Sequence, residues 1–328
     1  MEMKIILAST MLTIAASAHA QTMCIFDPLG TQGDNYGMMR DYAIAAKQWG
    51  VDLKLRPYTD ERVAAEDFKA GQCDGVALTG MRARQFNSFI GSIDAIGALP
   101  NNTSTKMIIT LMANPKLATD MIQNGYEVAG VTTLGSAYIM VRDKKINSLA
   151  KAAGIKFGVL DYDKAQAKLI QKVGAQPVSV DLLTIGAKFN NGQVDAIGMP
   201  AMGFKPFELY KGLGTQGAII RFPVLQVMGN ILIRPNLFPD GYGQKSRTWV
   251  AGLLGREIDN INKLEASIDP KYWLDISANE KLGYTKLMRE GRMDLTNEGI
   301  YNKKMMGLLK KVRCTQDPNN FECSLNGE

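Results

Sequence analysis

A short apolar run that follows a glycine and an aspartate occurs twice along the chain. Residues 68–80 have the sequence Phe-Lys-Ala-Gly-Gln-Cys-Asp-Gly-Val-Ala-Leu-Thr-Gly, and residues 189–200 have Phe-Asn-Asn-Gly-Gln-Val-Asp-Ala-Ile-Gly-Met-Pro. Glycine suits the left-handed position after a helix, and each apolar run has the length and flanks of a buried strand. Each copy therefore predicts a helix, a glycine stop and a buried strand. Two copies about one domain apart indicate two similar lobes.

The residues before the first copy alternate between strand and helix patterns. A short apolar strand is expected at 23–26, and apolar positions recur with helical spacing at 36–49. A second strand is expected at 51–56 and a second helix at about 60–69. With the strand of the first copy, the order is β-α-β-α-β. Right-handed crossovers make this order a parallel three-stranded half-domain.

The residues before the second copy predict the same order of elements. Strands are expected at 155–160 and 176–180, and helices at 164–173 and 182–190. The strand of the second copy, at 194–199, completes the set. The chain therefore contains two half-domains of the same construction.

Two β-rich regions connect these half-domains. Residues 125–141 contain two β-rich runs, and residues 218–234 contain two more. Long strands that pass from one lobe to the other act as hinges, and two crossings would let the lobes close like a clamp. The tail at 246–312 has helical patterning with an apolar face, and we expect it to pack across both lobes.

These elements predict an α/β protein of two lobes, each a parallel or mixed sheet with flanking helices, joined by hinge strands. Lobe 1 is expected to contain residues 21–135 together with about 225–328, which include the C-terminal helices. Lobe 2 is expected to contain residues 136–224. The length of 328 residues agrees with two domains of ordinary size.

The first 20 residues have the pattern of a cleavable signal peptide. Lys4 gives a positive start, residues 5–16 are apolar, and Ala18-His19-Ala20 is a small-x-small cleavage site, so we expect cleavage after Ala20. No later stretch approaches the ~18 apolar residues of a membrane helix. The sequence therefore predicts an exported periplasmic protein that does not span a membrane.

The only histidine of the chain, His19, is lost with the signal peptide. Nucleophile-His-acid triads, histidine acid/base catalysis and the usual zinc sites are thereby excluded, and we expect no cofactor or metal. The net charge is +6, but the basic residues are spread along the chain without a polybasic run. We therefore expect no nucleic-acid partner.

The chain has four cysteines, an even number that favours two disulfides in an oxidising compartment. Cys314 and Cys323 flank a turn-forming set of residues and are expected to pair locally. This leaves Cys24, in the first strand, to pair with Cys73, just before the strand of the first copy. A thiol metal site is the alternative, but the mature chain has neither histidine nor a Cys-x-x-Cys spacing.

Four stretches, at 141–148, 153–160, 174–178 and 189–195, resemble the extracytoplasmic solute-binding proteins. Among these proteins the likeness is to the receptors of tripartite (TRAP-type) transporters and a related set of solute-binding proteins. The resemblance implies a periplasmic-binding-protein fold that closes on a small molecule and delivers it to membrane transporter subunits. Many such receptors carry an arginine for the ligand carboxylate in the strand after a Gly-x-Lys element. This chain has Gly158 there, so the resemblance does not extend to organic-acid specificity.

The candidate ligand contacts follow the predicted strands, because ligands of open α/β sheets bind beyond the carboxyl ends of the strands. Arginine suits a carboxylate or phosphate, aspartate suits an ammonium group, and tyrosine and methionine supply apolar walls. The predicted contacts are Asp27, Arg82, Arg84, Ser136, Tyr138, Arg142, Asp161, Tyr162 and Met199.

Several of these residues also have a purely structural interpretation. Asp27 could belong to a surface turn, and Arg82 and Arg84 could form a solvated charge pair at a helix start. Arg142 could equally form a salt bridge between the lobes.

The sequence thus predicts a binding protein, not an enzyme, for a small polar or zwitterionic ligand. An accessory protein of an efflux or envelope complex is the alternative, and a large apolar patch outside the cleft would favour it. An enzyme that uses Asp27 and Asp161 as cleft carboxylates is a further alternative from a different class.

Overall fold

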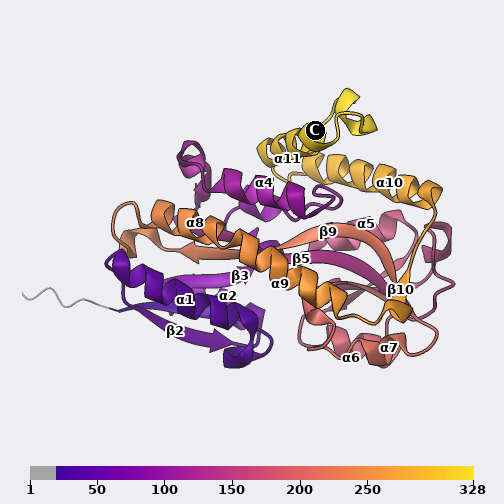
Figure 1. The fold of residues 1–328 in the computed structure, drawn as a ribbon, viewed down its shortest axis with the longest axis horizontal. Coiled ribbons are helices and arrows are strands. Elements are labelled where there is room, and N and C mark those ends of the chain that lie inside the picture. The colour runs from indigo at the N-terminus through magenta and orange to yellow at the C-terminus, as the bar shows by residue number, and fades with distance from the viewer. Residues whose placement is uncertain (1–19) are drawn as a thin grey trace, which may run out of the picture.

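One mixed sheet runs through both halves of the molecule in the computed structural model, which describes residues 20–328 (Figure 1). Within these residues ten strands take part, with β10 (Trp273–Leu274) paired to β9, β4 (Ile122–Gln123) paired to β5, and the others in the order β2-β1-β3-β9-β5-β8-β6-β7. Residues 1–19, where we predict most of the signal peptide, lie outside the described residues. In the part of the chain that is described, none of the helices has the length and apolar character needed to cross a membrane.

Lobe 1 is built from the first half-domain. Its strands β1 and β2 are parallel, as are β1 and β3. The elements in chain order are β1 (Gln21–Phe26), α1 (Asp34–Gln48), β2 (Leu53–Tyr58), α2 (Glu61–Lys69) and β3 (Gly75–Thr79). The predicted β-α-β-α-β order is therefore confirmed.

Lobe 2 repeats this construction. Strand β6 pairs in parallel with β7 and with β8. The elements in chain order are β6 (Lys156–Leu160), α5 (Lys164–Lys172), β7 (Gln176–Val180), α6 (Ile185–Asn190) and β8 (Ala196–Pro200). Helix α6 begins three residues later than predicted, because the Asp181 carboxylate accepts hydrogen bonds from the Thr184 N–H and hydroxyl and holds the preceding residues in a turn.

Two long antiparallel strands, β5 (Tyr126–Val141) and β9 (Ala218–Ile233), join the lobes. Each replaces two β-rich runs of the sequence prediction. One end of β9 pairs with β3 of lobe 1, and one end of β5 pairs with β8 of lobe 2. The pairing of β5 with β9 shifts register at several points, one of them beside Gly135, whose φ is +98°. Bulges of this kind bend and twist a strand pair where it changes lobe.

The predicted helical tail is four helices with an interruption: α8 (Tyr242–Gly252), α9 (Leu254–Ala266), α10 (Ala278–Asn297) and α11 (Lys303–Gln316). Helix α9 runs across the long strands from lobe 1 toward lobe 2 (Figure 1). Its Leu254 packs in the core of lobe 1, and its Leu264 packs against the core of lobe 2. Between α9 and α10 the chain forms β10, which pairs with β9.

Irregular chain and short helices fill the region between β3 and β5. Apart from a helix start at Arg82 and Arg84, the sequence prediction assigned no element there. The structure places in it the α-helices α3 (Gly80–Ala83) and α4 (Asn102–Met112), 3-10 helices at Ile90–Ser92 and Pro115–Met121, and strand β4. Helix α4 packs beside α11 at the top of the view in Figure 1.

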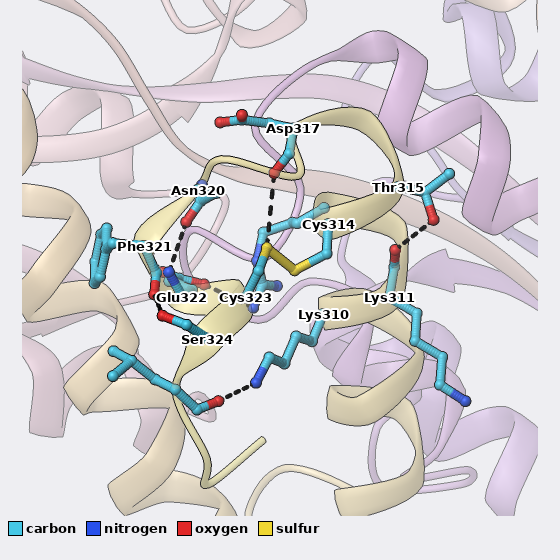
Figure 2. Close-up of a disulfide and its surroundings, with 12 residues drawn as sticks. Lys310, Lys311, Cys314, Thr315, Asp317, Asn320, Phe321, Glu322, Cys323 and Ser324 are labelled. Atoms are coloured by element: carbon cyan, nitrogen blue, oxygen red, sulfur yellow. Dashed lines mark hydrogen bonds and ion pairs between the residues drawn. A yellow bond between two sulfur atoms is a disulfide. The ribbon is translucent and has the colours of Figure 1, made fainter.

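Both predicted disulfides are present. Cys24–Cys73 joins β1 to the residues before β3 inside the core of lobe 1. Cys314–Cys323 joins α11 to the short helix at Phe321–Ser324, across the turn that contains Asp317 and Asn320 (Figure 2).

Candidate ligand site between the lobes

A cavity of about 360 Å³ lies between the lobes. It is at the carboxyl ends of β1, β3, β6 and β8, where the strand rule places a ligand. Apolar side chains from both lobes and from the long strands form most of its wall, among them Phe26, Leu29, Met81, Leu134, Ile139, Phe157, Leu160, Met199, Phe204 and Val224. A molecule bound there would touch both lobes at once.

Asp27 lines this cavity, but its carboxylate is used by its own loop. One oxygen accepts from the Leu29 N–H at 2.9 Å, and the other accepts from the Tyr36 N–H at 3.1 Å, at the start of α1. Gly33 passes so close that an added Cβ would lie 1.8 Å from the carboxylate. Burial raises the pKa of Asp27, and these backbone donors oppose that rise. Both carboxylate oxygens of Asp27 are therefore already bound by backbone N–H groups, and its role in the cavity wall is to hold this loop in place.

Arg82 and Tyr162 meet each other across the cleft. The Arg82 guanidinium lies 3.4 Å from the centre of the Tyr162 ring, and the Tyr162 hydroxyl donates to Glu61 Oε2 at 3.0 Å. Glu61 is buried at the start of α2, 3.6 Å from Arg82, and it also accepts from the Thr79 N–H. Burial raises the pKa of Glu61. The sequence did not single out Glu61, which connects these two predicted residues.

Arg84 makes a second contact between the lobes. Its Nη1 donates to Asp163 Oδ1 at 3.0 Å, while its Nε donates to the Gly91 carbonyl at 2.8 Å. Asp163 also caps α5 by accepting from the Ala165 N–H. We call Glu61, Arg82 and Arg84 of lobe 1 with Tyr162 and Asp163 of lobe 2 the interlobe latch. The latch holds the lobes together in this structure.

The two predicted hinge contacts lie outside the cavity wall. Ser136 accepts a hydrogen bond from the Gln226 side chain at 2.8 Å, and the Tyr138 hydroxyl donates to Glu265 at 3.2 Å. The cavity is lined instead by Ala137 and other residues of β5. Register shifts on both sides of Ala137 change which side chains face the cavity, so simple alternation does not identify them.

Arg142 supports lobe 2 from outside the cavity. It follows β5, and its Nη1 donates to the carbonyls of Phe189 and Asn190 at the end of α6, at 2.6 and 3.0 Å. Arg234 follows β9 and donates in the same way to Phe68 and Lys69 at the end of α2, at 2.6 and 3.0 Å. The two arginines are thus equivalent members of the internal repeat.

The aspartates of the repeat are equivalent in the same sense. Asp74 accepts from the Thr22 N–H in lobe 1, and Asp195 accepts from the Lys156 N–H in lobe 2, both at 2.8 Å. Each aspartate fixes the start of the first strand of its lobe.

Replacing either Arg142 or Arg234 with alanine is expected to lower the free energy of unfolding by about 1–3 kcal/mol, because each change removes charged hydrogen bonds to two helix-end carbonyls. Urea unfolding measures the loss. Alanine at the exposed Arg40 of α1 is the matched control and should cost less than about 0.5 kcal/mol. A loss at one arginine but none at the other would contradict their equivalence.

Basic residues are nearly absent from the cavity wall. In the described part of the chain, Lys205 is the one basic residue in the lining, and it is exposed. Gly158, where the resemblance implied an arginine, does line the cavity, and an added Cβ would lie 3.1 Å from Ile197. Of the predicted contacts, Asp27 and Met199 line the cavity, whereas Asp161 is exposed outside its lining.

Asp94 is a cavity residue that the sequence prediction missed. It is 2% exposed, and its carboxyl oxygens pair with no side chain among the described residues, although the backbone N–H groups of Met81 and Met228 stabilise its charged form. Burial raises the pKa of Asp94 well above its usual value, although the Arg84 guanidinium opposes the shift. The sequence signal was a single acidic residue inside the otherwise apolar stretch Ile93-Asp94-Ala95-Ile96, outside any periodic pattern.

Comparison with known proteins identifies the family of this chain. The family described as "Solute-binding protein AdeT 1/2" matches residues 43–328. The chain belongs to this family. It is 54% identical to "Probable solute-binding protein AdeT1" of Acinetobacter baumannii over 304 residues, which are 93% of this chain and 100% of the relative. AdeT2 of the same organism is 33% identical over 241 residues, which are 72% of this chain and 100% of the relative.

Solved structures confirm the two-lobed fold of this AdeT 1/2 family member. A TRAP periplasmic solute-binding protein from Desulfovibrio salexigens, with bound orotic acid, has a TM-score of 0.73 at 14% identity and covers 90% of this chain and 99% of its own. A TRAP periplasmic solute-binding protein from Haemophilus influenzae, with bound L-gulonate, has a TM-score of 0.73 at 12% identity and covers 89% and 99%. The relatives by family and by fold are solute-binding proteins.

Proposed function

We propose that this protein is a periplasmic receptor that captures a small organic molecule between its lobes and delivers it to a membrane transporter. The observation that carries the proposal is the cavity between the lobes, whose wall comes from both lobes and from the strands that join them. Pockets of this size and apolar character are typical of small-molecule sites.

Capture by closure agrees with the way the lobes are joined. We propose lobe boundaries at the middle of the long strands, with 21–135 and about 225–328 in one lobe and 136–224 in the other. Ser136 and Gln226 lie opposite each other at this point, beside the register shifts of β5. A ligand that contacts both lobes would favour the closed state by as much as it prefers that state to the open one.

Export to the periplasm is supported by the signal-peptide pattern and by the cysteines. All four cysteines are in disulfides, which persist in oxidising compartments. In the periplasm the outer surfaces of the two lobes would be free to contact transporter subunits in the membrane.

The alternative role in an efflux or envelope complex has less support. A large apolar patch on the surface outside the cleft would favour such a role. The exposed large apolar side chains of the described residues come from separate elements, for example Ile44 from α1, Leu282 from α10 and Leu237 from the segment after β9. Single exposed apolar side chains are usual on protein surfaces.

Native mass spectrometry of protein purified from the periplasm tests the receptor function. We expect a co-purified small molecule, or a rise in melting temperature of several degrees with one chemical class from a panel of acids, amines, amino acids and sugars. The control is a variant with Gly198→Trp, which would place a large side chain at the cavity wall, because Gly198 lines the cavity and an added Cβ there meets open space. A protein without bound molecules that responds to no class would contradict the proposal.

A further inference from the structure

The chemistry of the cavity restricts the ligand class, if the proposed receptor function is correct. Sequence reasoning assigned Arg82, Arg84 and Arg142 to an anionic ligand group. In the structure the first two belong to the interlobe latch, and the third binds helix-end carbonyls outside the cavity. A ligand carboxylate would therefore find only the exposed Lys205 among the basic residues of the described lining.

The buried charges beside the cavity are unequal in number. Arg84 pairs with Asp163 at 3.0 Å and also acts electrostatically on Asp94. The Tyr301 ring lies 5.2 Å from this guanidinium and adds no positive charge. Two buried carboxyl groups thus share one cation. Asp94 is the group that forms no ion pair and no side-chain hydrogen bond among the described residues.

We propose that the cavity binds an organic amine, a molecule with a largely apolar body and one protonated nitrogen that pairs with Asp94. The apolar wall supplies the free energy of burying the body. The ammonium group supplies the second cation, so that two carboxyl groups meet two positive charges in a site of low dielectric. An acid of similar shape would add a further carboxyl group beside Asp94 and Asp163 without a further cation.

The protonation of Asp94 gives the proposal a second observable. Burial raises the pKa of this carboxyl, and a cation beside it would lower that pKa again. The groups that face it are Arg84, Asp163 and Tyr301, together with the backbone N–H groups of Met81 and Met228. Amine binding should therefore lower the pKa of Asp94.

Calorimetric titration of the full chain with three probes of one shape tests the ligand class. The probes are phenylbutylamine, phenylbutanol and phenylbutyrate. We expect the amine to bind at least about tenfold more tightly than the alcohol, and the acid to bind most weakly. Asp94→Asn keeps the size of the side chain and should remove the preference for the amine over the alcohol. Asp161→Asn, at an exposed aspartate outside the lining, is the matched control and should keep the preference.

Three outcomes would overturn the amine proposal. These are tightest binding of the acid, an amine preference that persists in Asp94→Asn, and binding of none of the probes. The wild-type ranking decides the first and third outcomes even if a variant does not fold. Co-purification of a molecule that lacks a basic nitrogen would overturn the amine class while the receptor function stands, so the two failures are distinguishable.

Discussion

The Arg84→Ala variant is expected to be more open in solution and to melt at a lower temperature than the wild type. The substitution removes the cation that Asp163 contacts at 3.0 Å and leaves two buried carboxyl groups, Asp163 and Asp94, without a positive partner. Breaking a buried pair by removing one partner costs roughly 3–5 kcal/mol. Opening the lobes hydrates both carboxylates, so the closed state should lose much of this free energy relative to the open state.

Small-angle X-ray scattering and thermal unfolding of the ligand-free protein measure the two effects. The control is Arg62→Ala on α2, because Arg62 is exposed and its one ion pair within residues 20–328 is with Asp60 of its own lobe. It should leave the radius of gyration and the melting temperature unchanged. An unchanged radius of gyration for Arg84→Ala would show that the latch does not set the position of the lobes.

Tyr162→Phe provides a milder test of the same latch. The variant keeps the ring under Arg82 and removes only the hydroxyl that donates to Glu61. It should therefore open the lobes less than Arg84→Ala does.

The internal repeat could be predicted from the sequence because it depends on local chemistry. Gly71 follows α2 and Gly192 follows α6, and their φ values are +76° and +73°. Glycine adopts this left-handed conformation without steric cost. The strands that follow are short apolar runs whose burial can be recognised from composition alone. The two disulfides could be predicted from the same local signals, because one pair of cysteines flanks a predicted turn and the other pair lies at neighbouring predicted strands.

The partners of the site residues could not be predicted in this way. The strand rule selected Arg82 and Tyr162 as candidate contacts, but their contact with each other joins residues 80 positions apart in different lobes. Asp94 lies in irregular chain after α3, where neither helical nor strand periodicity applies. Only the closed arrangement of the lobes shows that these residues meet.

The directions in which the side chains of β5 point could not be predicted from the sequence either, for a different reason. Alternation along an ideal strand predicts that Ser136 and Tyr138 face one side. The register shifts in the pairing of β5 with β9 interrupt that alternation at the position where the strand changes lobe. Bulges depend on the partner strand and the twist of the sheet, so the sequence of one strand does not reveal them.

Arg292→Ala is expected to lower the free energy of unfolding by roughly 3–5 kcal/mol. Arg292 is on α10, is 0% exposed and donates to both oxygens of Glu322 at 2.9 and 2.8 Å and to the Ile96 carbonyl. It also pairs with Glu328, and Arg313 of α11 contacts the same two glutamates. Without Arg292 two buried carboxylates would share one cation.

The disulfide beside this cluster allows the ionic contribution to be separated from that of the covalent bond. Glu322 adjoins Cys323, which is tied to Cys314 of α11 (Figure 2). The Cys314→Ala/Cys323→Ala variant opens a loop with a sequence separation of 9 and should cost roughly 2–3 kcal/mol on loop-entropy grounds. Alanine at the exposed Arg256 of α9 is the control and should cost less than about 1 kcal/mol.

The loss in Arg292→Ala should also depend on pH. Burial alone would raise the pKa of Glu328, but Arg292 and Arg313 hold it below its usual value. A carboxyl with a lowered folded-state pKa stabilises the fold above its unfolded pKa of about 4.3, and this stabilisation is lost as the pH falls through the folded-state pKa. In urea unfolding, the difference between wild type and Arg292→Ala should therefore be constant near neutral pH and shrink in acid. A difference that is small at neutral pH, or that grows in acid, would mean that this cluster does not anchor the residues after α11.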